Sequence, residues 1–208
     1  MTINTDDPAY MVDGVLTDGE AWVALGTTTL SSGAVNIGFT SSTGANDWSQ
    51  YMDLVLVSSL RSDESTQASY LRVMVNSASV VTGGYTDQGL WSTTTGSAGV
   101  LVAGKNASTT QGIAGYMVAG SATANIFSTH VTSISDINSA KNKQMFTYSA
   151  ADQAGSTTTG GYTSIFSTTV NTQAPVTSVY ISLYPTGSDE IQPYSRVDLF
   201  GVLPRMVS

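Results

Sequence analysis

Few residues in this chain could do acid–base or nucleophilic chemistry. It holds one histidine, His130, and no cysteine. A Ser-His-Asp triad would have to be built around His130, because general-base work needs an imidazole held by a carboxylate beside a nucleophile. The sequence has no Gly-x-Ser-x-Gly turn, and His130 lies in a strand-like run. We therefore interpret His130 as a strand side chain and predict no catalytic residues.

Carboxylates offer a second kind of chemistry. The adjacent acids Asp189-Glu190 and Asp6-Asp7 supply oxygen ligands that calcium accepts, but neither pair belongs to an Asp-x-Asp-x-Asp loop. Zinc sites use cysteine or several histidines, which the chain lacks. We predict no metal and no cofactor, and we interpret Asp189-Glu190 as solvated acids in an exposed loop. A polysaccharide depolymerase would need two facing carboxyl groups about 5 to 10 Å apart, and the fifteen acids leave that alternative open.

Aromatic residues offer a third, binding role. Three tryptophans and ten tyrosines are present, and aromatic residues in strands are more often core than ligand platforms. Trp91 lies among Gly89, Ser92 and the run Thr93-Thr94-Thr95, a composition that indicates a loop. Trp91 is therefore our candidate for stacking on a sugar ring.

Short apolar or alternating runs separated by turn residues predict the elements that must position these side chains. We expect strands at 21–30, 34–39, 52–60, 70–75, 99–102, 113–118, 125–133, 144–149, 162–170, 177–184 and 195–203. The run 54–57 is apolar on both faces, which is typical of a central strand. Asp136 could cap a short helical turn within 135–151. The pattern predicts an all-β fold, an antiparallel jelly-roll-like sandwich.

Composition and charge fit one such domain. The chain has 208 residues, 29 serines and 29 threonines, and only 11% charged residues. We predict a single sandwich domain at 21–208 and an extended acidic arm at 1–20, where Asp6, Asp7, Tyr10 and Asp13 are candidate partner contacts. The net charge of −8, with seven scattered basic residues, argues against direct nucleic-acid binding. No apolar stretch is long enough to predict a membrane span or a signal peptide, so we expect a soluble protein made in the cytoplasm.

Two sets of short sequence motifs resemble motifs found in a group of tailed-phage virion proteins. The first set is Trp48 to Leu56, Arg61, Tyr70 to Asn76, and Tyr85, which gives a Tyr-x-x-Leu strand, an arginine and a second strand closing in asparagine. The second is Val176 to Leu203, where two alternating runs flank Pro185 to Glu190, as in the closing hairpin of those proteins. Here Phe200 and Val202 replace the usual Tyr and Ile. The match covers about a third of the chain.

This resemblance implies a non-enzymatic structural protein of a phage particle, a jelly-roll that decorates or cements the capsid. It implies a homotrimer over capsid symmetry axes, contacts with the major capsid protein, terminal arms that clamp neighbours, and a place on the capsid surface after synthesis in the host cytoplasm. The alternative is a tail-fibre or spike component that grips host polysaccharide through loop aromatics, with Trp91 as the residue to test.

Overall fold

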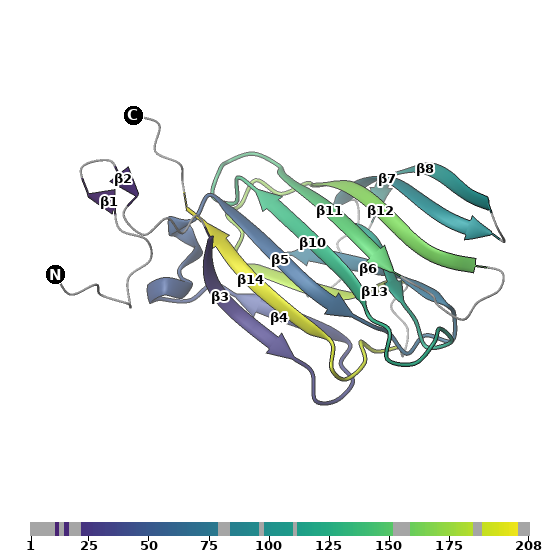
Figure 1. The fold of residues 1–208 in the computed structure, drawn as a ribbon. Helices are drawn as coiled ribbons and strands as arrows, with labels where there is room; N and C mark the ends of the chain where they lie inside the picture. Colours follow the sequence, from purple (N-terminus) through teal and green to yellow (C-terminus); the bar gives the residue numbers. More distant parts are fainter. Residues whose placement is uncertain are drawn as a thin grey trace.

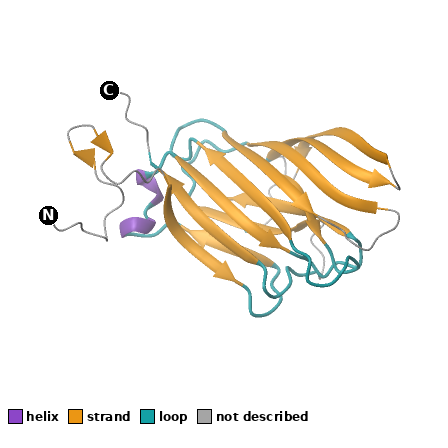
Figure 2. Ribbon diagram, viewed as in Figure 1, coloured by secondary structure: helices purple, strands orange, loops and turns teal. Residues whose placement is uncertain are grey.

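The body of the protein is built from two antiparallel β-sheets, and a separate two-stranded sheet precedes them in the sequence. A computed structural model describes residues 11–12, 15–16, 22–78, 84–95, 98–109, 112–151, 159–184 and 189–203. Within them lie the strands β1 (Met11–Val12), β2 (Val15–Leu16), β3 (Trp22–Thr29), β4 (Asn36–Thr40), β5 (Asp53–Leu60), β6 (Ala68–Val75), β7 (Tyr85–Thr95), β8 (Ala98–Thr109), β9 (Ile113–Val118), β10 (Ser128–Ser135), β11 (Lys143–Ala151), β12 (Thr159–Val170), β13 (Ser178–Tyr184) and β14 (Arg196–Val202). Two 3-10 helices, η1 (Gly44–Asn46) and η2 (Trp48–Gln50), precede β5 (Figure 2). Among the described residues, no helix has the length and apolar composition that a membrane crossing requires.

The order of the strands is that of a jelly roll. Four strands of the long sheet follow the order β3-β14-β5-β10, and the short sheet follows β4-β13-β6-β9 (Figure 1). Chain-adjacent strands such as β3 and β4, β5 and β6, or β13 and β14 therefore lie in opposite sheets. This interleaving of two four-stranded sheets defines the jelly roll. The predicted antiparallel jelly-roll-like sandwich is confirmed, and each of the eleven predicted strands overlaps an observed one.

Two inserted hairpins lengthen one sheet only. The pair β7-β8 is inserted between β6 and β9, and the pair β11-β12 between β10 and β13. Together they continue the long sheet as β10-β11-β12-β7-β8, whereas the short sheet ends at β9. Strand β9 packs against β10, β11 and β12. The outer part of the long sheet, β7 and β8, therefore extends past the edge of the short sheet (Figure 1).

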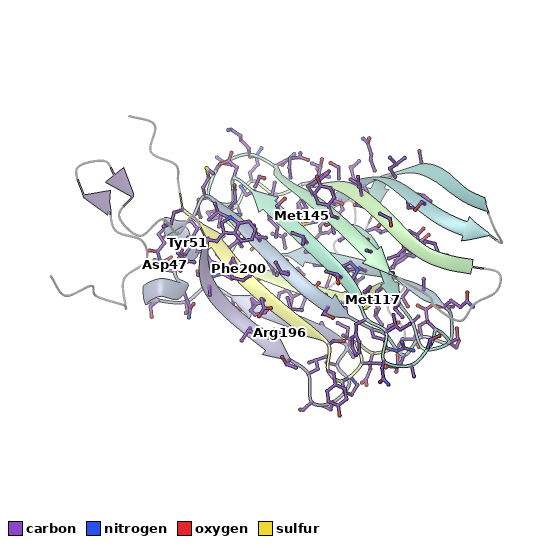
Figure 3. All side chains as sticks on the ribbon, viewed as in Figure 1. Asp47, Tyr51, Met117, Met145, Arg196 and Phe200 are labelled. Carbon is purple, nitrogen blue, oxygen red and sulfur yellow. The ribbon has the colours of Figure 1, made fainter. Side chains whose placement is uncertain are left out.

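The hydrophobic core lies between the two sheets, and buried side chains alternate with exposed ones along the strands that enclose it. Burial alternates residue by residue along β11, as expected when one face of a strand meets the core and the other solvent. Strand β5 lies between β14 and β10, and its apolar run 54–57 confirms the predicted central strand. The buried methionines Met117 and Met145 come from opposite sheets (Figure 3). Other large core residues are Trp48, Tyr51, Leu54, Leu56, Leu60, Leu71, Val73, Tyr85, Ile134, Val179, Ile181, Ile191, Val197 and Leu199.

The predicted closing hairpin at Val176 to Leu203 is wrong, although both of its strands are present. Strand β13 pairs with β4 and β6, and β14 pairs with β3 and β5, so the two strands lie in opposite sheets. The connection crosses the sandwich at Ile191, a fully buried residue that forms bridges with Ala34 and Ser62. A period of two identifies a strand but not its partner. Asp189 and Glu190, expected in an exposed loop, are half-buried.

The helical turn expected within 135–151 is also absent from these residues, all of which are described. Asp136 has a left-handed φ of 58°, and its N–H donates to the Asp53 carboxylate at 2.7 Å. Ile137 is fully buried, and the Asn138 amide donates to backbone carbonyls of 48–51. These tertiary contacts outweigh the local helix propensity. Lys143, expected in the helical turn, begins β11.

Two residues that carry the family resemblance fix loops to strands. The buried Arg61 guanidinium donates to the backbone carbonyls of Gly120, Ala122, Thr123 and Ile126 at 2.7 to 3.3 Å. Asn76 ends β6 with φ of 57°; its amide donates to the Pro175 carbonyl, and its side-chain oxygen accepts from the Thr177 N–H, both at 2.8 Å. Both side chains satisfy backbone groups that would otherwise lack partners. Their role in this chain is structural.

Of the predicted arm at 1–20, the structure describes only β1 and β2. These strands pair antiparallel, with Met11 opposite Leu16 and Val12 opposite Val15. The rest of the arm lies outside the described residues.

Candidate functional site

Of the five residues predicted to bind partners, the structure describes only Trp91. Asp6, Asp7, Tyr10 and Asp13 lie outside the described residues. Trp91 lies in β7, so the expected loop position is wrong. Strand β7 was hidden because Gly89 and the run Thr93-Thr94-Thr95 are typical of loops, yet β7 pairs with both β12 and β8.

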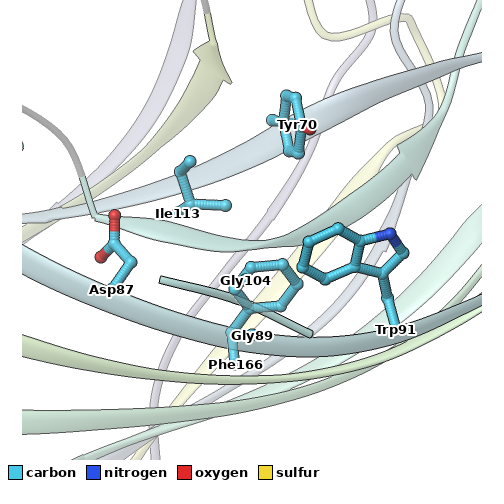
Figure 4. Close-up of a pocket in the computed structure, with 7 residues that line it drawn as sticks. All are labelled: Tyr70, Asp87, Gly89, Trp91, Gly104, Ile113 and Phe166. Atoms are coloured by element: carbon cyan, nitrogen blue, oxygen red, sulfur yellow. The ribbon is translucent and has the colours of Figure 1, made fainter. Parts of the chain in front are cut away.

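Trp91 forms part of a pocket at the edge of the short sheet. The pocket has a volume of about 210 Å³ and is lined by Tyr70, Asp87, Gly89, Trp91, Gly104, Ile113 and Phe166. Tyr70 and Ile113 come from the neighbouring strands β6 and β9 of the short sheet, and the remaining residues from β7, β8 and β12 of the long sheet. The pocket therefore exists because the inserted hairpins carry the long sheet past β9. Figure 4 shows the seven lining residues.

Two glycines let the aromatic rings of the pocket lie against the sheet. Gly89 and Gly104 are directly opposite in the β7–β8 ladder. A Cβ atom on Gly89 would come within 2.4 Å of the Phe166 ring, and one on Gly104 within 2.7 Å of the Trp91 ring. The two rings are nearly parallel, at 8°, with centroids 5.9 Å apart. Each ring thus covers the bare backbone of a glycine, a known way for aromatic side chains to support glycine in sheets.

Tyrosines continue this aromatic surface around the edge of the short sheet. Tyr116 stacks on Tyr162 with centroids 4.6 Å apart and lies 5.9 Å from Trp91. Across the short sheet Tyr184 is opposite Tyr70, and Tyr70 is opposite Tyr116. The Tyr116 hydroxyl donates to the Tyr70 hydroxyl at 3.2 Å, and burial is the main cause that raises the pKa of Tyr116 well above its ordinary value. The Tyr116 hydroxyl therefore stays protonated at neutral pH.

A buried carboxylate lines the other end of the pocket, and two ionisable side chains lie near it in the fold. Asp87, on β7, is buried and lies at the end away from Trp91 (Figure 4). Burial raises the pKa of the neighbouring Tyr85, the Asp87 charge raises it further, and the Arg72 charge lowers it. Arg72 is buried on β6, donates from Nε to the Ser182 hydroxyl at 2.8 Å, and burial lowers its pKa. The pocket therefore has an aromatic end and a carboxylate end.

His130 is a buried strand residue, as predicted. Its Nε2 lies 2.9 Å from the Tyr116 carbonyl, and because a carbonyl can only accept, Nε2 carries the proton. Nδ1 has no partner among the described residues. Complete burial lowers the pKa of His130 to about 4, so the ring is neutral at pH 7. Among the described residues, no three acidic or histidine side chains are grouped as a metal site requires.

Sequence reasoning missed most of the pocket although a signal was present. Asp87, Gly89 and Trp91 are spaced two residues apart, which places them on one face of any strand that contains them. Once β7 is recognised, that alternation predicts a carboxylate, a bare backbone position and an indole in a row. The contributions of Tyr70 and Phe166 come from strands distant in sequence and needed the sheet order.

The chain matches no protein-family model, no curated protein and no solved structure. The strand order and the side chains described above are therefore the features that bear on function.

Proposed function

We propose that this chain is a non-enzymatic structural protein of a phage particle, which decorates or cements the capsid surface. The observation that carries the proposal is the interleaved order of β3-β14-β5-β10 and β4-β13-β6-β9. Viral capsid domains and lectins are prominent users of this jelly-roll arrangement. The resemblance to virion proteins supports this choice among jelly rolls, and several of the residues that carry the resemblance hold this fold together. Arg61, Asn76, Trp48 and Tyr51 are examples.

An exposed apolar row on the outer face of the long sheet supports contact with another protein. Tyr148, Ile165 and Leu90 are opposite one another on β11, β12 and β7, and their exposed fractions are 55%, 37% and 41%. The cross-strand row continues through Val131 and Val57 at one end and Ala103 at the other. Contiguous exposed apolar side chains are typical of interaction surfaces. We assign this outer row to contacts between copies of the chain.

Self-association through the outer row fits the expected homotrimer, because most soluble oligomers are closed and symmetric. The acidic arm, with Asp6, Asp7, Tyr10 and Asp13, then reaches a neighbouring subunit or the major capsid protein. The arm at 1–20 holds five carboxylates and no lysine or arginine, so it favours a basic partner surface.

The proposal is tested by measuring the mass of the purified chain by light scattering and its binding to preformed capsids by co-sedimentation. We expect a trimer that co-sediments with capsids, and we expect the double variant Tyr148→Ser/Ile165→Thr to be a monomer with an unchanged circular dichroism spectrum. The matched control is Tyr194→Asn, because Tyr194 is 79% exposed, lies off the row, and has a φ of 70° that asparagine tolerates. A monomeric wild type that does not bind capsids would contradict the proposal.

A further inference from the structure

The pocket beside β9 has the shape of a site for one small ring-shaped ligand. Its volume of about 210 Å³ lies below the range of pockets for drug-sized ligands, which begins at about 300 Å³. One wall is the half-buried indole of Trp91, supported from the side by the buried ring of Phe166. Gly89 and Gly104 also line the pocket, where the Phe166 and Trp91 rings lie against their bare backbone. These surfaces are flat, so they favour a flat ligand face.

Polar groups in the pocket suit hydroxyl groups of a ligand. Asp87 lines the other end with a carboxylate that is only 1% exposed, and a ligand O–H that reaches this narrow opening meets a strong acceptor. The Tyr70 hydroxyl accepts from Tyr116 at 3.2 Å, which leaves its own proton available to a ligand oxygen. The pocket thus combines an aromatic face, an acceptor and a donor. A pyranose ring has the complementary groups, with one apolar C–H face and hydroxyls at its rim.

A quaternary ammonium ion is the main competing ligand, because aromatic rings with a carboxylate also attract cations. The ring geometry favours the sugar. Aromatic cages surround a cation with rings at steep angles, whereas the planes of Trp91 and Phe166 differ by only 8°. Tyr116, whose ring is set at 54° to Trp91, is buried and does not line the pocket.

We propose that this pocket binds a single pyranose ring of a glycan. The apolar face of the sugar stacks on Trp91, and its hydroxyls bond to Asp87 and Tyr70. Tyr70 and Tyr184, which are half-buried and opposite each other on β6 and β13, form a tyrosine row that leads away from the pocket across the outer face of the short sheet, and this row provides further rings for neighbouring sugars. Glycan binding depends only on the fold of the isolated chain. A failure of the proposed virion role would therefore leave this proposal intact, and the reverse also holds.

The test uses the full chain and saturation-transfer NMR with glucose, galactose, mannose and their N-acetyl forms. We expect at least one sugar to bind, with stronger saturation of the ring protons on the face that stacks on Trp91. The disaccharide of that sugar should bind more tightly, because the tyrosine row adds stacking surface. No binding by any of these sugars at tens of millimolar would overturn the proposal.

Variants locate the site. Trp91→Ala and Asp87→Asn should each weaken binding by about tenfold or more, as expected for loss of one stacking ring or one charge-assisted hydrogen bond. Gly104→Val, which places side-chain atoms against the Trp91 ring, gives a second way to block the pocket if Trp91→Ala fails to fold. The matched control is Trp22→Ala, because Trp22 is 47% exposed on β3, away from the pocket, and its loss should leave sugar binding unchanged. Equal binding by wild type and pocket variants, or tighter binding of tetramethylammonium than of any sugar, would refute the assignment.

Discussion

At the scale of residues, the polar side chains inside this protein mostly stabilise the fold. His130 illustrates this, because it is completely buried and donates only to the Tyr116 carbonyl. Its pKa falls from an ordinary 6.5 to about 4 on folding. The folded state therefore binds a proton less readily than the unfolded state does, and acid favours unfolding.

The first prediction concerns the pH dependence of stability. The contribution of neutral His130 is fully present above pH 6.5 and is lost as the pH falls from 6.5 towards 4. The loss is on the order of 3 kcal/mol, at 1.36 kcal/mol per pKa unit. Urea unfolding at pH 7, 6, 5 and 4 measures it. In His130→Gln, whose amide can still donate to Tyr116, the decline across this window should be smaller; an identical decline would show that His130 does not cause it.

Arg61 gives a second prediction at this scale. Arg61→Met should lower the free energy of unfolding by about 3 kcal/mol, because the carbonyls of the 120–126 loop lose a buried charged donor. Arg196→Met is the control, since Arg196 is exposed and its partner Asp198 is two residues away on the same strand. Chemical denaturation of both variants compares them. Equal stability of the two would contradict a structural role for Arg61.

At the scale of elements, the sequence contained the strands but not their partners. The alternation of Val179, Ile181 and Leu183 predicts β13 correctly, yet nothing in that alternation shows that β14 lies in the other sheet. Strand β7 escaped prediction because glycine and threonine runs are typical of loops, and only its pairing with β12 and β8 reveals it. The pocket could be predicted only in part, since one face of β7 is readable but its partners on β6, β9 and β12 depend on tertiary pairing.

A substitution at Gly89 tests how β7 packs against the Phe166 side chain of β12. Gly89→Ala should cost about 2 kcal/mol of stability, because the added Cβ would meet the Phe166 ring at 2.4 Å and displace it. The near-ultraviolet circular dichroism of the aromatic cluster should change with it. Gln88→Ala, at the exposed neighbouring position, should change neither quantity. If Gly89→Ala is as stable as the control and keeps the same spectrum, the Phe166 ring does not lie against the backbone of Gly89.

At the scale of the whole molecule, two hairpins added to one sheet of a jelly roll create both candidate surfaces. The outer face of this extension carries the apolar row of Tyr148, Ile165 and Leu90, and its inner face carries the pocket beside β9. Contacts between subunits and binding of a glycan would therefore use opposite faces of the same strands. A decorating protein could then keep its pocket accessible while its outer row is covered.

The most direct test of the central proposal is cryo-electron microscopy of phage particles made with and without this chain. We expect a regular density on the capsid surface of complete particles, with jelly-roll dimensions and trimeric symmetry, that disappears when the chain is removed. Density lost from the tail instead would favour the fibre or spike alternative. Particles identical in head and tail would contradict a virion role altogether.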